Sequence, residues 1–308
     1  MIKLQEETSS PGIWKFSQAL SPLEKKFWLT LDEGSTPVAK KGEVFFKRED
    51  FNPTGSLKDR GMAFQISQSY QEGRKDLVIS SSGNAAISAA AFCSLSGINL
   101  HAFVSQKIQS QKLAELKKFK PKIYLSGRSV SDSIKFAKKN GYKNLRPSID
   151  KFGPEGYKTI AFELFKQVGR FNDLFLPVSS ATALVGIAQG FKLLGFMPRF
   201  HACQSTMIFT IAGFYDQDFS KTATSLASSL VARLTPRNKE AREIISRSQG
   251  TGWVISDQEI KKALAWLKNQ GIITSFEGGL SLAAIWKANS KGFKTRKTVC
   301  LLTGKNYE

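Results

Sequence analysis

From residue 43 onward, the sequence alternates between short apolar runs and longer helix-like segments, and this alternation restricts the fold more than any other feature. Residues 77–79 (Leu-Val-Ile) and 299–302 (Val-Cys-Leu-Leu) are continuously apolar. Such runs are typical of strands that helices cover on both faces, as in a parallel sheet. We therefore expect an α/β protein whose sheets are mostly parallel.

The expected elements follow from the hydrophobic pattern and from the turn residues between segments. The expected strands are residues 43–48, 77–81, 99–105, 122–127, 173–178, 200–204 and 298–302. The expected helices are residues 56–71, 84–95, 109–119, 129–140, 155–168, 182–194, 238–248, 257–270 and 279–289. Residues 1–35 are expected to be irregular, with aromatic anchors.

The charge of the chain is strongly positive. Its 308 residues carry a formal charge of +20, and the sequence pI is about 9.9. The basic residues are interpreted as scattered over helix faces such as residues 112–122, and no RNA or DNA motif accompanies them. We expect a solvated basic surface that suits anionic substrates and no specific nucleic-acid partner, with non-specific binding of nucleic acid left open.

Cysteine and histidine usage argues against several kinds of site. Cys93, Cys203 and Cys300 lie far apart and have neither zinc spacing nor a disulfide framework. His101 and His201 have no metal-ligand partner nearby in sequence, so neither a metal site nor a Ser-His-Asp triad is expected. The N-terminus lacks an apolar signal core, and residues 85–95 are too short to span a bilayer, so we expect a cytoplasmic protein without membrane contact.

Residues 52–61 read Asn-Pro-Thr-Gly-Ser-Leu-Lys-Asp-Arg-Gly and connect an expected strand to an expected helix. Ser56 is a favourable helix N-cap, which places Lys58 in the first helical turn. The positive end of the helix dipole disfavours an ammonium ion there, and a lysine that acts as a free amine would suit this position. A solvated lysine beside Asp59 is the alternative interpretation for Lys58.

This segment resembles the cofactor-lysine motif of threonine synthase and its relatives, with Leu57 where phenylalanine is usual. These are pyridoxal 5'-phosphate (PLP) enzymes of the tryptophan synthase β-like fold type II. The resemblance implies that Lys58 forms the Schiff base with PLP. Further similarity to threonine synthases extends over residues 31–38 and 155–163.

A second segment, Ser81-Ser-Gly-Asn84-Ala, follows an apolar strand and opens a helix, where backbone N–H groups form an anion site. It resembles the Ser-Ser-Gly-Asn-Ala loop of the family. By that resemblance, Asn84 bonds the phenolic oxygen of the cofactor, and Ser81, Ser82 and Gly83 bind the substrate carboxylate. Ordinary helix capping is the alternative.

A third segment, residues 176–187, resembles the strand, phosphate loop and helix of the same family. The usual glycines are replaced by Ser179 and by Ala181 or Thr182, depending on the alignment. Side chains at such positions restrict left-handed backbone and close approach to a phosphate. The resemblance implies that the loop binds the PLP phosphate through Ser179, Ser180, Ala181, Thr182 and Ala183.

A fourth segment places Thr303 and Gly304 directly after the apolar strand 298–302. Members of the family have Ser, Thr or Cys here, beside the pyridine nitrogen of PLP. The resemblance assigns Thr303 to this position, where a neutral partner leaves the nitrogen unprotonated. A strand end with a turn glycine is the alternative.

The resemblance implies two three-layer domains, a larger cofactor domain of residues 1–75 and 155–308 and a smaller, mobile domain of residues 76–154. It implies a lyase or synthase that eliminates or replaces groups at Cβ or Cγ of a small amino-acid substrate. Threonine synthase, which converts O-phosphohomoserine to threonine and phosphate, is the best single expectation. Threonine or serine ammonia-lyase, cysteine synthase and a non-catalytic descendant remain alternatives, and the oligomeric state is open, with a homodimer as one expectation.

Overall fold

The computed structural model describes residues 7–230, 232 and 236–307. Contacts divide the chain into two compact units, each of which combines separate stretches of the sequence. Of the described residues, unit 1 contains 35–51 and those between 157 and 306, and unit 2 contains 7–34, 52–156 and 307.

The sheet of unit 1 has six strands in the order β1-β2-β10-β7-β8-β9. β1 and β2 are antiparallel, and each further neighbouring pair is parallel. β10 lies between β2 and β7, so the last strand in sequence is central and fully buried. The strands are β1 (Val38–Lys41), β2 (Val44–Arg48), β7 (Asp173–Pro177), β8 (Arg199–Ser205), β9 (Thr251–Ile255) and β10 (Thr298–Leu302).

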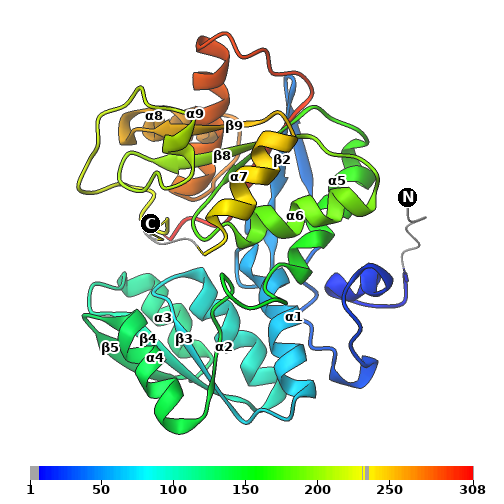
Figure 1. Cartoon of the computed structure of the whole chain (residues 1–308), viewed down its shortest axis with the longest axis vertical. Helices are drawn as coiled ribbons and strands as arrows, with labels where there is room; N and C mark the ends of the chain where they lie inside the picture. The colour runs from blue at the N-terminus through cyan, green and yellow to red at the C-terminus, as the bar shows by residue number, and fades with distance from the viewer. Residues whose placement is uncertain (1–6, 231, 233–235, 308) are drawn as a thin grey trace. The chain divides into compact units, whose positions relative to one another are not determined.

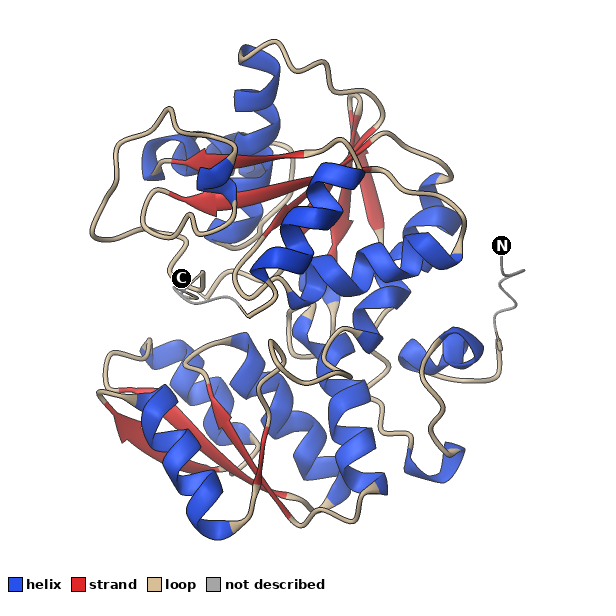
Figure 2. Ribbon diagram, in the orientation of Figure 1, coloured by secondary structure: helices blue, strands red, loops and turns tan. Residues whose placement is uncertain are grey.

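Helices cover both faces of this sheet (Figures 1 and 2). On one face, Phe46, Phe175 and Cys300 form a core with α8 (Asp257–Asn269) and α9 (Phe276–Ser290). On the other face lie three helices, and Phe191 of the middle one packs edge-on against Phe200 of β8. These are α5 (Lys158–Val168), α6 (Thr182–Leu193) and α7 (Asn238–Arg247). The short 3-10 helix η3 (Glu49–Phe51) follows β2, and η5 (Ala212–Phe214) lies between β8 and α7 in sequence.

The sheet of unit 2 has four parallel strands in the order β5-β4-β3-β6. The strands are β3 (Asp76–Ser80), β4 (Asn99–Ser105), β5 (Lys122–Ser126) and β6 (Lys143–Asn144). α1 (Lys58–Gln71), α2 (Asn84–Ser96) and α3 (Ser110–Lys118) build the core on one face, and α4 (Ser129–Asn140) packs on the other. The 3-10 helices are η1 (Gly12–Ala19), η2 (Lys25–Phe27) and η4 (Glu155–Tyr157).

The expected fold class, α/β with three layers and mostly parallel sheets, is confirmed. The expected helix 129–140 and the expected strands 99–105 and 298–302 have the bounds that the structure gives them. Three strands were not expected, namely β1, β6 and β9. The N-terminal region is more regular than expected, because two 3-10 helices form there and the rings of Trp14 and Trp28 stack at 4.9 Å.

Candidate active site

The carboxyl ends of β7 and β10 bring two of the predicted segments together in unit 1. The two strands are parallel neighbours, and their register pairs Cys300 with Phe175. If this register is continued for three residues toward the carboxyl ends of the strands, Thr303 lies opposite Val178. Val178 is at the start of the loop that leads to α6. Thr303 is partly buried and follows the last residue of β10 directly. The predicted phosphate loop and the predicted ring-nitrogen partner therefore share one edge of the sheet.

The N-terminus of α6 presents unpaired backbone donors at this edge. The first helical hydrogen bond runs from the amide of Val185 to the carbonyl of Ala181, at 3.0 Å. Within the residues that the structure describes, the amides of Thr182, Ala183 and Leu184 donate no hydrogen bond. Free N–H groups at a helix start, together with the helix dipole, are suited to bind a phosphate.

Ala181 adopts the backbone conformation that normally requires glycine. Its φ is +62° and its ψ is 0°, and the residue is buried at the position just before α6. Thr182 is a regular helical residue, so Ala181 is the position that replaces the left-handed glycine. The hydroxyls of Ser180 and Thr182 lie 3.1 Å apart, and Ser179 and Ser180 are partly buried. Both neighbours of Ala181 therefore place hydroxyl groups beside the loop.

The loop after β3 in unit 2 has a different hydrogen-bond pattern. The amide of Ser81 donates to the carbonyl of Phe103 at 3.2 Å, and the amide of Gly83 donates to the Ser81 hydroxyl at 3.2 Å. The Ser82 hydroxyl accepts the amide of Ser105 at 2.6 Å. In the described chain, the amides left without an acceptor are those of Ser82, Asn84 and Ala85. Ser82 and the start of α2 therefore hold the free donors that the expected carboxylate site would use.

The side chain of Asn84 carries a polar atom that lacks a partner. Its Oδ1 atom is buried and forms no hydrogen bond with the part of the chain that the structure describes. A buried polar atom without a partner is costly, so native proteins keep such atoms chiefly where a ligand or water completes them. Oxygen and nitrogen of an amide are exchanged by a rotation of the group, so the free end can also donate.

Lys58 is the first residue of α1 and is partly buried. The turn before it is closed by an amide–carbonyl bond of 2.7 Å from Gly55 to Asn52. The carboxylate of Asp59 is fully buried and accepts both the amide and the hydroxyl of Thr54, at 2.7 and 2.5 Å. These bonds fix the backbone immediately next to the predicted cofactor lysine.

Ser56 makes the contacts of a helix N-cap, as expected, although the assigned helix begins two residues later, at Lys58. Its hydroxyl accepts the amide of Lys58 at 3.3 Å, and its carbonyl accepts the amide of Asp59. Leu57, between Ser56 and Lys58, already has right-handed helical conformation.

Tyr307 contacts this turn and was not predicted from the sequence. Its hydroxyl donates to the carbonyl of Thr54 at 3.5 Å, and the Lys112 ammonium lies 5.4 Å from its ring centroid. Burial, together with the charges of Glu115 and Asp59, raises the pKa of Tyr307 above its ordinary value. Tyr307 therefore stays a neutral donor, which no local sequence signal indicates because its partner is 253 residues away.

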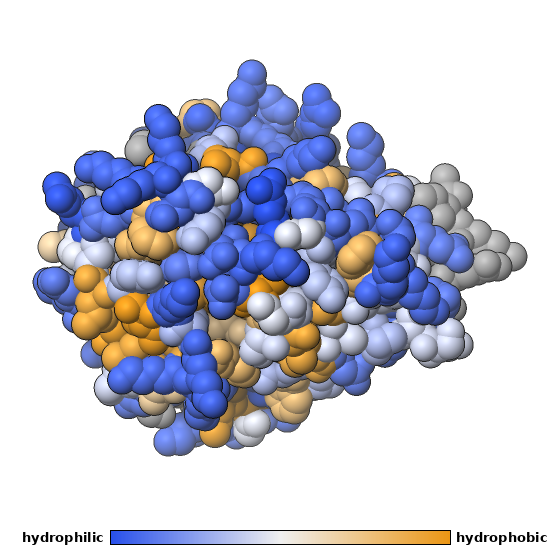
Figure 3. Space-filling view, turned by 90° about the horizontal axis from the view of Figure 1, so that it is seen from below, coloured by the Kyte–Doolittle hydropathy of each residue, from blue (hydrophilic) through white to orange (hydrophobic). Residues whose placement is uncertain are grey.

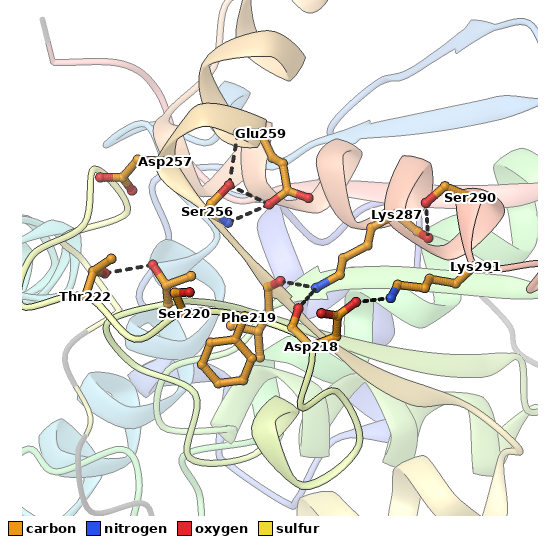
Figure 4. A pocket seen from close by; sticks show the side chains of 12 residues that line it. Asp218, Phe219, Ser220, Thr222, Ser256, Asp257, Glu259, Lys287, Ser290 and Lys291 are labelled. Carbon is orange, nitrogen blue, oxygen red and sulfur yellow. Dashed lines mark hydrogen bonds and ion pairs between the residues drawn. The ribbon is translucent and has the colours of Figure 1, made fainter.

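A separate cavity of about 530 Å³ lies in unit 1 beside Thr206, Val254 and α9 (Figure 4). Polar side chains that line this cavity form hydrogen bonds and ion pairs with other residues of the chain. The Lys287 ammonium donates to Asp216 at 2.6 Å and to the carbonyl of Val254 at 2.8 Å. Ser256 and Glu259 form the capping box of α8. This cavity holds structural polar groups and none of the predicted site residues.

Other site chemistries find no support within the described residues. These contain no cluster of three or more potential metal ligands, and no helix there is long and apolar enough to cross a membrane. Each cysteine is buried, and burial raises the pKa of Cys93 and Cys203 far above that of a reactive thiol.

Comparison with known proteins decides the family. The sequence model of the family described as "Pyridoxal-phosphate dependent enzyme" matches residues 29–304. The chain belongs to this family. Pyridoxal phosphate is therefore its cofactor, and the expectation of PLP is confirmed.

Relatives within this PLP family differ in reaction. A catabolic L-threonine dehydratase from Staphylococcus aureus (strain USA300) is 27% identical over 279 residues, which cover 87% of this chain and 80% of the relative. A threonine synthase from Methanocaldococcus jannaschii is 26% identical over 322 residues, which cover 95% of this chain and 80% of the relative. Threonine synthase specifically is thus not distinguished from its relatives.

Solved structures confirm the expected fold type II. Maize serine racemase superimposes with a TM-score of 0.77 at 23% identity, covering 88% of each chain. Threonine deaminase isoform 2 from Solanum lycopersicum superimposes with a TM-score of 0.75 at 18% identity, covering 88% of this chain and 79% of that one. At these identities the likeness describes the fold and leaves the reaction open.

The residues present fit PLP by their chemistry. The α6 amides and the hydroxyls of Ser180 and Thr182 suit a phosphate. The unpartnered amide side chain of Asn84 suits the phenolic oxygen. Thr303 supplies a neutral hydroxyl at the edge that carries the phosphate loop. One residue fits this role less well. Ala181 has a left-handed backbone, which glycine would adopt without steric strain.

Proposed function

We propose that this protein is a PLP-dependent lyase that eliminates or replaces a group at Cβ or Cγ of an amino acid. The observation that carries the proposal is Lys58, placed at the first position of α1 by a turn that Asp59 and Thr54 close. A turn built in this way holds an amine at a fixed point, as a covalent cofactor requires. The best single substrate is O-phosphohomoserine, which loses phosphate while water adds a hydroxyl group at Cβ, so that threonine and phosphate are the products.

Each predicted residue has one task in this proposal. Lys58 holds the cofactor through its ε-amino group and, once the substrate amine has replaced it, moves the Cα and Cβ protons as a general base. The amides of Thr182 and Ala183 hold the cofactor phosphate. Asn84 bonds the phenolic oxygen, and Ser82 with its neighbours binds the substrate carboxylate. When bound, PLP supplies an electron sink that makes the Cα proton acidic.

The uncharged surroundings of the ring favour elimination or replacement over transamination. Thr303 carries no charge, so it does not stabilise a protonated pyridine nitrogen. A transaminase depends on that protonation, which an aspartate usually maintains, and no aspartate lies near Thr303 in sequence. The second candidate reaction is elimination of water from threonine or serine, followed by hydrolysis that releases ammonia and leaves a 2-oxo acid. It uses the same groups and is favoured by the similarity to a threonine dehydratase.

The test combines chemical trapping with two assays. Borohydride reduction of the PLP-loaded protein, followed by peptide mapping, should find the cofactor on Lys58. O-phosphohomoserine should then release phosphate and form threonine, and Lys58→Ala should abolish this reaction. Lys58→Arg is the matched control, because it keeps the positive charge but cannot hold the cofactor covalently.

The outcomes separate the alternatives. Release of ammonia from threonine or serine without phosphate release would identify the dehydratase reaction. A protein that is trapped on Lys58 but ignores both substrates and O-acetylserine would be the non-catalytic descendant. Label on a lysine other than Lys58 would refute the site assignment itself.

A further inference from the structure

The positive charge of the chain is concentrated in one part of unit 2. Between Lys107 and Arg146 there are twelve basic and two acidic residues, so this stretch has a formal charge of +10, half of the +20 of the whole chain. The stretch contains α3, β5 and α4, with β5 at the edge of its sheet. Nine of its basic side chains are exposed, namely Lys107, Lys117, Lys118, Lys120, Lys122, Arg128, Lys135, Lys138 and Lys139. We call these nine residues, which flank the β5 edge from α3 on one side of the sheet and from α4 on the other, the basic face.

Internal ion pairs leave most of this charge uncompensated. Lys118 pairs with Glu115 at 2.6 Å, and Asp132 accepts the hydroxyl of Ser126. Among the described residues, no other member of the basic face forms an ion pair. A surface designed only for solubility mixes both signs of charge, and this one does not. The basic face therefore has the electrostatic character of a binding surface for a polyanion.

Exposed aliphatic side chains accompany the lysines. Val130 and Ile134 lie one turn apart on α4 and are 55% and 38% exposed. The next residue of that helical row is Lys138, four positions after Ile134. The buried side of α4 is formed by Ser133 and Ala137, so the aliphatic pair does not belong to the core. Figure 3 shows hydrophobic groups lying between hydrophilic side chains on one face of the molecule.

We propose that α4 and the adjoining edge of β5 dock on an anionic lipid bilayer. Lysine clusters beside exposed aliphatic residues bind such surfaces, because the ammonium groups meet the headgroups and the aliphatic chains enter the boundary with the acyl region. This surface would hold the enzyme at a membrane, and the proposal does not depend on which reaction the enzyme catalyses.

Two other partners fit the same surface less well. A nucleic-acid backbone has no apolar surface for Val130 and Ile134 to contact. The aromatic rings that could stack on bases pack against each other instead, with the ring centroids of Tyr124 and Phe136 5.4 Å apart. The basic face contains eight lysines and one arginine, whereas arginine is preferred for recognition of bases and phosphates. A second copy of the chain would repel the same positive charge, which disfavours self-association through this face.

The experiment is sedimentation of the full chain with vesicles of phosphatidylcholine alone and of phosphatidylcholine mixed with phosphatidylglycerol. Wild type should bind the mixed vesicles and not the neutral ones. The triple change K135E/K138E/K139E should weaken binding by about a hundredfold, given roughly fivefold for each lysine near the surface. The double change V130S/I134S should weaken it by at least about threefold without altering the charge.

The matched control is K261E/K262E/K268E on α8 of unit 1, which changes the same charge on exposed lysines and should bind like wild type. Circular dichroism verifies that each variant is folded, and the corresponding Lys→Gln set replaces any that is not. The proposal is refuted if wild type ignores the mixed vesicles, or if the α8 control loses as much binding as the α4 variant. Binding of an RNA duplex that exceeds vesicle binding and is indifferent to V130S/I134S would assign the surface to nucleic acid instead.

Discussion

Two βαβ segments, one in each unit, are built alike and differ in what surrounds them. In unit 2 the segment is β3-α2-β4, and in unit 1 it is β7-α6-β8. Each first strand begins with an aspartate, and each second strand has a histidine at its third position. His101 Nε2 lies 3.0 Å from Asp76, and His201 Nε2 lies 2.9 Å from Asp173. The chain thus uses both of its histidines to join neighbouring parallel strands near their amino ends.

The surroundings of the two pairs are different. His201 and Asp173 are completely buried, and the His201 ring stacks on Phe175 at 4.1 Å. The indole N–H of Trp253 donates to Nδ1 of His201, so the ring proton is on Nε2 and points to Asp173. Burial lowers the pKa of His201, which keeps the ring neutral. In unit 2 the Asp76 side chain is 19% exposed, so the same register produces a pair that water can reach. The positions of Asp and His in the two strands thus determine that each pair forms, and burial determines how much the pair contributes to stability.

The largest expected effect comes from breaking the buried pair. Asp173→Ala should lower the free energy of unfolding by about 3 kcal/mol or more, because His201 and Arg199 lose their buried acceptor. Asp76→Ala should cost about 1 kcal/mol, since water replaces its carboxylate. Urea unfolding of both variants measures the difference. Equal losses would show that burial does not distinguish the two pairs.

A second prediction uses pH to distinguish the units. The Glu33 carboxyl in unit 2 is fully buried, and burial raises its pKa to about 7 although hydrogen bonds from Leu31 and Ile13 oppose the rise. Its folded pKa lies above its unfolded value of 4.5, so its contribution to stability is complete below pH 4.5 and is lost as pH rises through about 7. Unit 2 should lose about 1–3 kcal/mol between pH 5 and pH 8, and Glu33→Gln should remove most of this loss.

Unit 1 should respond to pH in the opposite direction. The folded pKa of His201 is lowered by burial, so the unfolded chain binds its proton more readily and stability falls as pH drops below about 6.5. Burial alone would raise the pKa of Asp173, but its bonds to His201 and Arg199 lower it overall, which acts in the same direction. Hydrogen exchange at pH 5 and pH 8, resolved by peptide, tests both trends. A parallel response of the two units would contradict the comparison.

The smallest expected effect concerns the two loops before α2 and α6. Ala181→Gly removes the cost of a left-handed alanine and should stabilise unit 1 by about 1 kcal/mol. It should also tighten PLP binding about fivefold, because the loop no longer has to be held in a strained conformation. Gly83 has extended backbone, and an added Cβ would meet no atom within 4 Å, so Gly83→Ala should leave folding unchanged. Urea unfolding and PLP titration measure the two variants, and a destabilising Ala181→Gly would exclude strain at this position.

Local patterns predicted much of the fold and less of the site. Residues 99–105 and 129–140 were predicted with their exact bounds because apolar runs and helical periodicity are local signals. β9 was missed, since Gly252 has low strand propensity and its strand forms only by pairing with β8.

The site depends on contacts that local patterns do not encode. The left-handed conformation of Ala181 contradicts the preference of alanine, so the local sequence does not indicate it. The Asp–His pairs join residues 25 and 28 positions apart, and the Tyr307–Thr54 contact joins residues 253 apart. The segments around Lys58, Asn84 and Thr303 were identified by resemblance, and their roles remain proposals.

The three buried thiols provide this protein with built-in reporters of local opening. Cys93 belongs to unit 2, and Cys203 and Cys300 belong to unit 1. A thiol with no access to solvent reacts with a labelling reagent only when its surroundings open, so each labelling rate measures the opening equilibrium of one unit. The native sequence can therefore report which unit opens first, without engineered probes, and mass spectrometry of the labelled peptides reads out both units in one sample.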